Sequence, residues 1–248
     1  MSDTEAVRQA KIDLTCALRT ASAMGLSEGI CNHFSYRVPG GDDGPEHFLI
    51  NPQGVYWAEM VPSDIVTVDV NGNRVAGNRP VEPTAFFIHS RVHRHKKNTR
   101  CVMHTHMPYT TSLTLIEKGR LEWCNQNALR FFGRVAYDDV YNGLALDEAE
   151  GDRICGTLGN ADVLFMANHG IILCGENIAH TFDDLYYLER SAMVQVLARS
   201  TGKKLKIVPD DVAALAAAQS EQERQQSRLH FDALKRQLDK TDPGWSER

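Results

Sequence analysis

Three histidines at the ends of two apolar segments are the residues whose types and spacing point most directly to chemistry. His104 and His106 close the apolar run that begins at Cys101, and His169 follows the run Val163–Met166. Residues two apart on a strand project to the same face, and a third histidine on a neighbouring loop would complete a facial set. Three imidazoles on one side of a divalent ion leave open positions for substrate or water, as a catalytic metal site requires.

The alternative interpretation is that these are separate core histidines, each with its own hydrogen-bond partner. An isolated buried histidine is usually of that kind, but burying several imidazoles without partners costs free energy. Histidines at two strand ends therefore favour a metal site. Zinc is the first choice because imidazole suits it, and manganese, iron or cobalt would fit the same ligands.

Alternating helical and extended segments must position these histidines. Apolar spacing predicts a helix from Glu5 to Met24, with Gly25 as its C-terminal cap. Further helices are predicted over 84–96, 146–158 and 178–200, and strands over 47–50, 65–70, 74–76, 101–106 and 163–166. Helices that alternate with strands indicate an α/β domain.

Composition excludes several classes of function. The 248 residues carry a net charge of −5, which offers no basic field for nucleic acid, and no apolar run has the length of a membrane span. The polar start at residues 1–5 resembles neither a signal nor a transit peptide, so we expect a cytoplasmic protein. The six cysteines include no CxxC pair, which favours free thiols over a disulfide framework.

Five ordered motifs carry a resemblance to a known family. They begin at Asn32, Asn51, His104, Asn168 and Tyr186. From about residue 10 to residue 200 the chain resembles the class II aldolase/adducin family, and its 133–139 and 187–189 stretches look closest to an adducin-like bacterial branch. The resemblance implies a three-layer α/β/α domain with a central, mainly antiparallel sheet. It also implies a homotetramer with a divalent metal held by histidines near subunit interfaces.

The resemblance assigns roles to individual positions. His104, His106 and His169 match the metal-binding histidines of the family. Its aldolases place a glutamate that binds the metal and moves protons at the position of Ala85 here, so the nearby Glu82 is expected to serve as the catalytic carboxylate. The alternative for Glu82 is a surface charge at a helix N-terminus, where the helix dipole favours an anion.

The positions that grip phosphate in the sugar-phosphate aldolases have changed here. They are occupied by Asn32 and His33, by Gln53 and Gly54, and by Pro83 and Thr84. Most small hydroxyl donors are gone, so the resemblance implies an unphosphorylated substrate. We expect the first four of these residues to bind its carboxylate or hydroxyl groups.

The proton donor of the resembling aldolases has no counterpart at its expected place. That donor is a tyrosine lent by the neighbouring subunit, and its offset falls at Asn125 here. Tyr109 is the replacement we predict, with Tyr137 and Tyr141 as further candidates. Each could equally be a core or interface aromatic.

The chain changes character after Gly202. Residues 210–240 are rich in Ala, Gln, Glu and Arg and predict a helical extension, so we divide the chain into a domain at 1–202 and an extension at 203–248. As a single helix the extension would be marginal, and its apolar stripe needs a partner. In a family tetramer the neighbouring subunit could supply it.

The function expected from these residues is that of a metal-dependent carbon–carbon lyase. It would act as an aldolase or a decarboxylase on a small, unphosphorylated hydroxy, keto or aromatic acid, through an enolate stabilised by the metal. Two alternatives remain: a non-catalytic, adducin-like binding protein, and an isomerase or epimerase that uses the same metal site. Neither a nucleic acid nor a membrane is expected as a partner.

Overall fold

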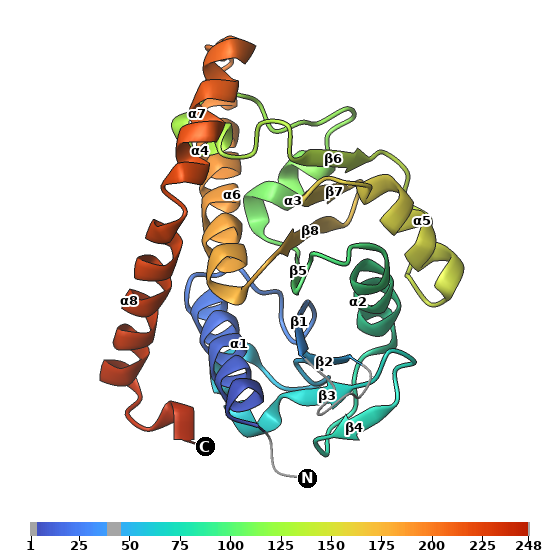
Figure 1. The fold of residues 1–248 in the computed structure, drawn as a ribbon. Helices are drawn as coiled ribbons and strands as arrows, with labels where there is room; N and C mark the ends of the chain where they lie inside the picture. The colour runs from blue at the N-terminus through green and yellow to red at the C-terminus, as the bar shows by residue number, and fades with distance from the viewer. Residues whose placement is uncertain (1–3, 39–45, 248) are drawn as a thin grey trace.

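A central β-sheet organises the computed structural model, which describes residues 4–38 and 46–247. Over these residues the sheet has eight strands in the order β4-β3-β2-β1-β5-β8-β7-β6 (Figure 1). The strands are β1 (His33–Val38), β2 (His47–Ile50), β3 (Val66–Val68), β4 (Arg74–Ala76), β5 (Cys101–Thr105), β6 (Val135–Asp138), β7 (Val163–Met166) and β8 (Gly170–Gly175). The first three residues of the polar start lie outside the described part of the chain.

The pairing of the strands confirms a mainly antiparallel sheet. The β6–β7 pair is parallel, and the other neighbouring pairs are antiparallel. Asn71 and Gly72 lie in the turn between β3 and β4, with Gly72 at a φ of +84° that suits glycine.

Helices cover both faces of the sheet. The helices are α1 (Glu5–Ala23), α2 (Pro83–His95), α3 (Pro108–Thr114), α4 (Gln126–Leu129), α5 (Glu148–Leu158), α6 (Ile178–Arg199), α7 (Asp210–Gln222) and α8 (Gln225–Thr241). Figure 1 shows α2 and α5 on one side of the sheet and α1 and α6 on the other. The expected three-layer α/β/α arrangement is confirmed.

Alternation along the buried strands creates the two layers of core. Cys101 and Met103 of β5 join the core that includes residues of α1 and α6, whereas Val102 joins the core that includes residues of α2 and α5. Because side chains alternate along a strand, His104 lies on the same side of the sheet as Val102. The alternation along β5 therefore places His104 on the side of the sheet that α2 and α5 cover.

The predicted segments differ from the observed ones mainly at their ends. The helices predicted over 5–24, 84–96, 146–158 and 178–200 are α1, α2, α5 and α6, each within two residues of its expected bounds. The strand predicted over 65–70 is shorter, since β3 covers Val66–Val68. The expected extension helix is interrupted, with Glu223 as the C-terminal cap of α7.

The extension packs against its own chain. Figure 1 shows α8 running beside α6 and α1. Phe231 is buried against Phe182 of α6, with 6.0 Å between ring centroids, and Trp245 is 1% exposed. The partner expected from a neighbouring subunit is therefore supplied for α8 by α6 and α1 of the same chain. Within the described ranges, no helix is both long and apolar enough to cross a membrane.

Candidate metal centre

The antiparallel sheet brings the three predicted histidines to one place. In the β5–β8 pair, Thr105 at the end of β5 lies opposite Ile171 near the start of β8. The turn that joins β7 to β8 carries His169 and therefore lies beside the end of β5. His104 and His106 thus meet a histidine more than sixty positions away in the sequence.

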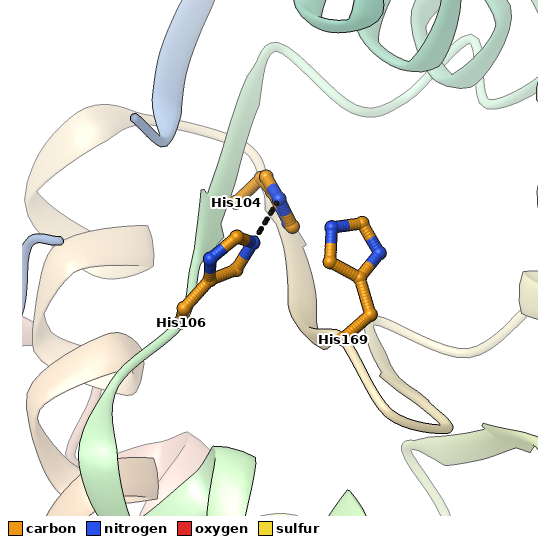
Figure 2. Close-up of side chains that lie close together, drawn as sticks. All are labelled: His104, His106 and His169. Atoms are coloured by element: carbon orange, nitrogen blue, oxygen red, sulfur yellow. Dashed lines mark hydrogen bonds between the residues drawn. The ribbon is translucent and has the colours of Figure 1, made fainter. Parts of the chain in front are cut away.

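The three rings converge on a common point (Figure 2). Their centroids lie 4.8–4.9 Å apart in each pair, with interplanar angles of 60–78°. One ligand nitrogen from each of His104, His106 and His169 lies within 4.8 Å of the other two. His104 is buried and the other two are half-buried, so the group lies at the edge of the core. The three histidines therefore lie together, as the sequence predicts.

Two of the ring nitrogens face each other without a proton to share. His104 donates its Nδ1–H to the carbonyl of Ile171 (2.9 Å), and His106 donates its Nδ1–H to the carboxylate of Glu28 (2.6 Å). A neutral imidazole with its proton on Nδ1 presents a lone pair at Nε2. The two Nε2 atoms are nevertheless 3.1 Å apart, the contact that is dashed in Figure 2.

A divalent cation accounts for this contact better than a hydrogen bond does. With nitrogen–metal bonds of about 2.1 Å, a separation of 3.1 Å between the two nitrogens corresponds to an angle of roughly 95° at the ion. Metal-bound histidines also typically donate their other N–H to a carbonyl or carboxylate, as His104 and His106 do. The donor set fits a divalent metal.

The Asn168-His169-Gly170 turn explains how His169 reaches the other two rings. Asn168 has a φ of +56°, a left-handed conformation that asparagine tolerates better than most residues. A side chain at Gly170 would lie 2.5 Å from the Thr105 carbonyl oxygen and 2.7 Å from Cδ2 of His106. Glycine therefore permits the close approach of β8 to the histidine pair.

Burial favours the neutral form of two of these imidazoles, His104 and His169. It lowers the pKa of His169 to about 4, with a further contribution from His106, and lowers the pKa of His104 well below its usual value. A histidine must be neutral to bind a metal, so the His104 and His169 rings are in the form that binds at pH 7.

Glu82 and His33 stand beside the three histidines. His33 lies opposite His104 in the β1–β5 pair, and their rings stack with centroids 5.4 Å apart. The His33 Nε2 is 2.6 Å from a Glu82 oxygen, and the Thr84 hydroxyl donates to the other oxygen at 2.6 Å. The hydrogen bond from His33 is the main cause that lowers the pKa of Glu82 to about 2. Glu82 therefore contacts a neighbour of the metal ligands and remains ionised.

The other predicted substrate-binding residues are Asn32, Gln53 and Gly54. Gln53 and Gly54 are exposed, and the backbone N–H of Gln53 donates to the Pro80 carbonyl (2.9 Å). Because Pro80 is two residues before Glu82, this bond places the Gln53 loop near Glu82. Asn32 is fully buried with a φ of +78°, and its side-chain oxygen accepts from the His106 amide at 3.3 Å. Asn32 thus supports the metal centre from within the chain.

The structure separates the tyrosine candidates. The Tyr109 ring packs against the core on the α1–α6 side, and its amide donates to Glu189; no described contact joins it to the three histidines, so its catalytic role stays a prediction. The Tyr137 hydroxyl accepts from the Leu121 amide. The Tyr141 ring, 49% exposed, lies 6.4 Å from the His169 ring and is the candidate beside the centre.

Two features of the site had weak signals in the sequence. Glu28 lies in a loop between predicted elements, 78 positions from the His106 that it contacts. His89 and His93, on α2, both contact the Ser35 hydroxyl, at 2.6 and 2.8 Å. Burial lowers the pKa of His93 to about 3. The two histidines are four positions apart, which places them on one face of α2.

Comparison with known sequences identifies relatives over most of the chain. The chain is 32% identical to a Pseudomonas aeruginosa protein provisionally named a class 2 aldolase, over 96% of this chain and 92% of that protein. It is also 32% identical to rat alpha-adducin over 79% of this chain, which corresponds to 27% of the adducin.

Comparison with solved structures gives the same result. An aldolase II superfamily protein from Pseudomonas syringae superposes with a TM-score of 0.87 at 30% identity, over 98% of this chain and 97% of that one. L-fuculose 1-phosphate aldolase from Glaciozyma antarctica shares the fold, with a TM-score of 0.82 at 21% identity over 97% and 95% of the two chains.

The Class II Aldolase and Adducin N-terminal domain profile matches residues 12–196. The chain belongs to the class II aldolase and adducin family.

Proposed function

We propose that the protein is a metal-dependent carbon–carbon lyase, an aldolase or a decarboxylase, for a small unphosphorylated hydroxy, keto or aromatic acid. The observation that carries this proposal is the convergence of the ring nitrogens of His104, His106 and His169 beside the His33–Glu82 pair. When bound, a divalent ion, zinc by preference, supplies a Lewis acid that polarises a substrate oxygen and lowers the energy of an enolate.

The histidines and the Glu82–His33 pair divide the work of the site. The three imidazoles hold the ion from one side, which leaves its other side for substrate. The Nε2 of His33 donates a hydrogen bond to the Glu82 carboxylate over 2.6 Å. Aldol cleavage needs a group that removes a hydroxyl proton, and decarboxylation needs one that returns a proton to carbon. The pair offers a proton-transfer group for either reaction.

The charge of Glu82 supports an unphosphorylated substrate. His33 and Thr84 occupy positions that grip phosphate in the resembling sugar-phosphate aldolases, and here both are hydrogen-bonded to the Glu82 carboxylate. A phosphate dianion placed there would meet this negative charge at short range. Gln53 and Gly54 lie on the exposed loop near Glu82 and remain available to bind the hydroxyl or carboxylate groups of a smaller acid.

Assembly as a homotetramer in the cytoplasm belongs to the same proposal. Val140, Tyr141 and Leu144 are 57%, 49% and 67% exposed, and Tyr141 adjoins His169. Large apolar side chains exposed together beside a functional site support a subunit contact there. A neighbouring subunit could then exclude water from the open side of the metal centre.

A screen of the zinc-loaded protein tests the proposed reaction. Hydroxy, keto and aromatic acids, each with its phosphorylated counterpart where one exists, are assayed for release of aldehyde or CO2. We expect at least one unphosphorylated acid to be cleaved, and Glu82→Gln to lower kcat by about 100-fold or more. Glu5→Gln, at the exposed start of α1, is the matched control and should leave kcat unchanged. A phosphorylated substrate used more than tenfold faster than every unphosphorylated acid would contradict the substrate assignment.

The similarity to adducins favours a second candidate, a non-catalytic binding protein. A chain of that kind would bind the metal and cleave none of the acids in the screen. Products that keep every carbon atom of the substrate would instead indicate an isomerase or epimerase. The same assay therefore separates the three functions.

A further inference from the structure

We infer that Glu28 is a positioning residue of the metal centre: its carboxylate orients the His106 ring and keeps the Nε2 of that ring free to bind the ion. This inference rests on the proposed metal centre and extends it beyond the three histidines. Glu28 belongs to the loop between α1 and β1 and matches none of the roles assigned from the sequence.

The contact between Glu28 and His106 has a defined polarity. The carboxylate oxygen of Glu28 is 2.6 Å from Nδ1 of His106, a short distance typical of a charge-assisted hydrogen bond. An ionised carboxylate only accepts, so Nδ1 carries the proton, and in the neutral ring this tautomer leaves the lone pair on Nε2. Without this acceptor, the proton of His106 could move to Nε2 and occupy the position that faces His104.

A buried asparagine, Asn32, holds the backbones of Glu28 and His106 close together. The Asn32 side-chain oxygen accepts from the backbone amide of Glu28 at 3.2 Å and from the backbone amide of His106 at 3.3 Å. Asn32 is fully buried, and its φ of +78° turns the chain between the loop and β1. One amide oxygen thus links the backbones of both residues. The Glu28 side chain is 64% exposed, so this backbone link, rather than side-chain packing, brings it to His106.

The two ligands of the close pair are oriented by different means. His104 is fixed by the carbonyl of Ile171, a backbone group that no substitution removes. His106 is fixed by a side chain that carries a full charge. A carboxylate partner raises the basicity of a histidine ligand, and loss of such a partner typically weakens metal binding 10- to 100-fold. Glu28 is therefore the part of the ligand-orienting set that can be altered without disturbing the sheet.

Metal titration of three variants tests the inference. Metal-free wild type, Glu28→Ala, Glu28→Gln and the control Glu5→Gln are titrated with Zn²⁺ against a competing chelator and with Co²⁺ by absorption spectroscopy. We expect Glu28→Ala to weaken zinc binding by about 10- to 100-fold and to alter the Co²⁺ spectrum. Glu28→Gln keeps an acceptor but loses the charge, so its loss should be smaller and its Co²⁺ spectrum should resemble that of the wild type. Glu5→Gln should match the wild type.

The outcomes separate this inference from the proposed function. Wild-type affinity, within twofold, in both Glu28 variants would overturn the role of Glu28 and leave the metal centre intact. A wild-type protein that binds neither ion would overturn the metal centre itself. Thermal unfolding of the metal-free variants serves as the folding control, and an unchanged Tm is expected because the Glu28 side chain is mostly exposed. If Glu28→Ala does not fold, the affinity of Glu28→Gln decides.

Discussion

Two clusters of polar side chains lie inside this protein, and they differ in how completely their groups are paired. One is the metal centre at the end of β5. The other, which we call the tail network, joins α6 and α4 to the C-terminal extension. Its members are Asp183, Asp184, Arg130, Arg134, Arg224, Ser227 and His230.

The tail network satisfies its carboxylates within the chain. Asp183 accepts hydrogen bonds from Arg130 (2.6 Å), Ser227 (2.8 Å) and His230 (2.8 Å). Asp184, 1% exposed, accepts two bonds from Arg224, at 2.7 and 2.9 Å, and one from Arg134 at 2.9 Å. Arg130 is thus engaged by Asp183.

The metal centre leaves several of its polar atoms unpaired. Asn32 Nδ2, His33 Nδ1 and His89 Nε2 are buried and have no hydrogen-bond partner among the described residues. The facing Nε2 atoms of His104 and His106 add two lone pairs to this deficit. Buried polar groups are normally paired, and exceptions call for an explanation such as a ligand. Incomplete pairing, rather than the number of buried polar groups, therefore distinguishes the metal centre from the tail network.

Removal of the extension after Gly202 should have the largest effect on stability. It would uncover Phe182, remove the Arg224 partner of Asp184 and take away the Ser227 and His230 partners of Asp183. We expect a larger fall in the free energy of unfolding than any single substitution below gives, measured by urea denaturation, while each folded chain still binds metal. A truncated protein with the wild-type midpoint, oligomer size and rate would show that the extension only aids solubility.

Asp184→Asn should come second. It removes the buried counter-charge shared by the half-buried Arg134 and Arg224, and breaking such a pair typically costs about 3–5 kcal/mol. Asp162→Asn is the matched control: it contacts the same Arg134 but its side chain is 37% exposed, so we expect a loss of about 1 kcal/mol or less. Equal losses in the two variants would contradict the assignment of the tail network to stability.

The dependence of the free energy of unfolding on acidic pH should reveal the contribution of Asp183. Burial alone would raise the pKa of Asp183, but the hydrogen bonds from His230 and Arg130 outweigh it and lower the pKa to about 2. A lowered carboxyl pKa adds stability above its unfolded value near 4, and this stability is lost as the pH falls toward 2. The loss should amount to roughly 2 kcal/mol. Asp183→Asn should flatten the fall in unfolding free energy between about pH 4 and pH 2; an unaltered slope would argue against the lowered pKa.

His169→Ala should have the smallest effect on the stability of the metal-free protein. Its ring is half-buried and belongs to a group whose nitrogens await a ligand, so we expect a change of about 1 kcal/mol or less. Urea denaturation in the presence of a chelator measures it. A loss as large as that of Asp184→Asn would mean that the histidines form a structural cluster.

The sequence predicted what depends on local spacing and missed what depends on distant partners. The bounds of α1, α2 and α6 follow from apolar residues at helical intervals, and the positions of His104 and His106 follow from alternation along β5. The interruption between α7 and α8 lies beside Arg224, whose bond to Asp184 spans 40 positions. Such a contact leaves no periodic signal in the sequence.

The strands β1, β6 and β8 were not predicted, and the reason is clearest for β8. Five of the six β8 residues are buried, so the strand lacks the polar alternation that marks a half-exposed strand. The role of Glu28 depends on the left-handed turn at Asn32 and on a contact 78 positions away. The motif that begins at Asn32 could be recognised in the sequence, but the contacts that Asn32 makes could be identified only from the fold.

Metal analysis of the purified protein tests the central claim most directly. The metal content per chain is measured by elemental analysis for wild type, His104→Ala and His169→Ala, with circular dichroism to establish that each variant is folded. We predict close to one divalent metal per wild-type chain and loss of that metal in both variants. Full metal retention in both folded variants would contradict the assignment of these histidines as its ligands.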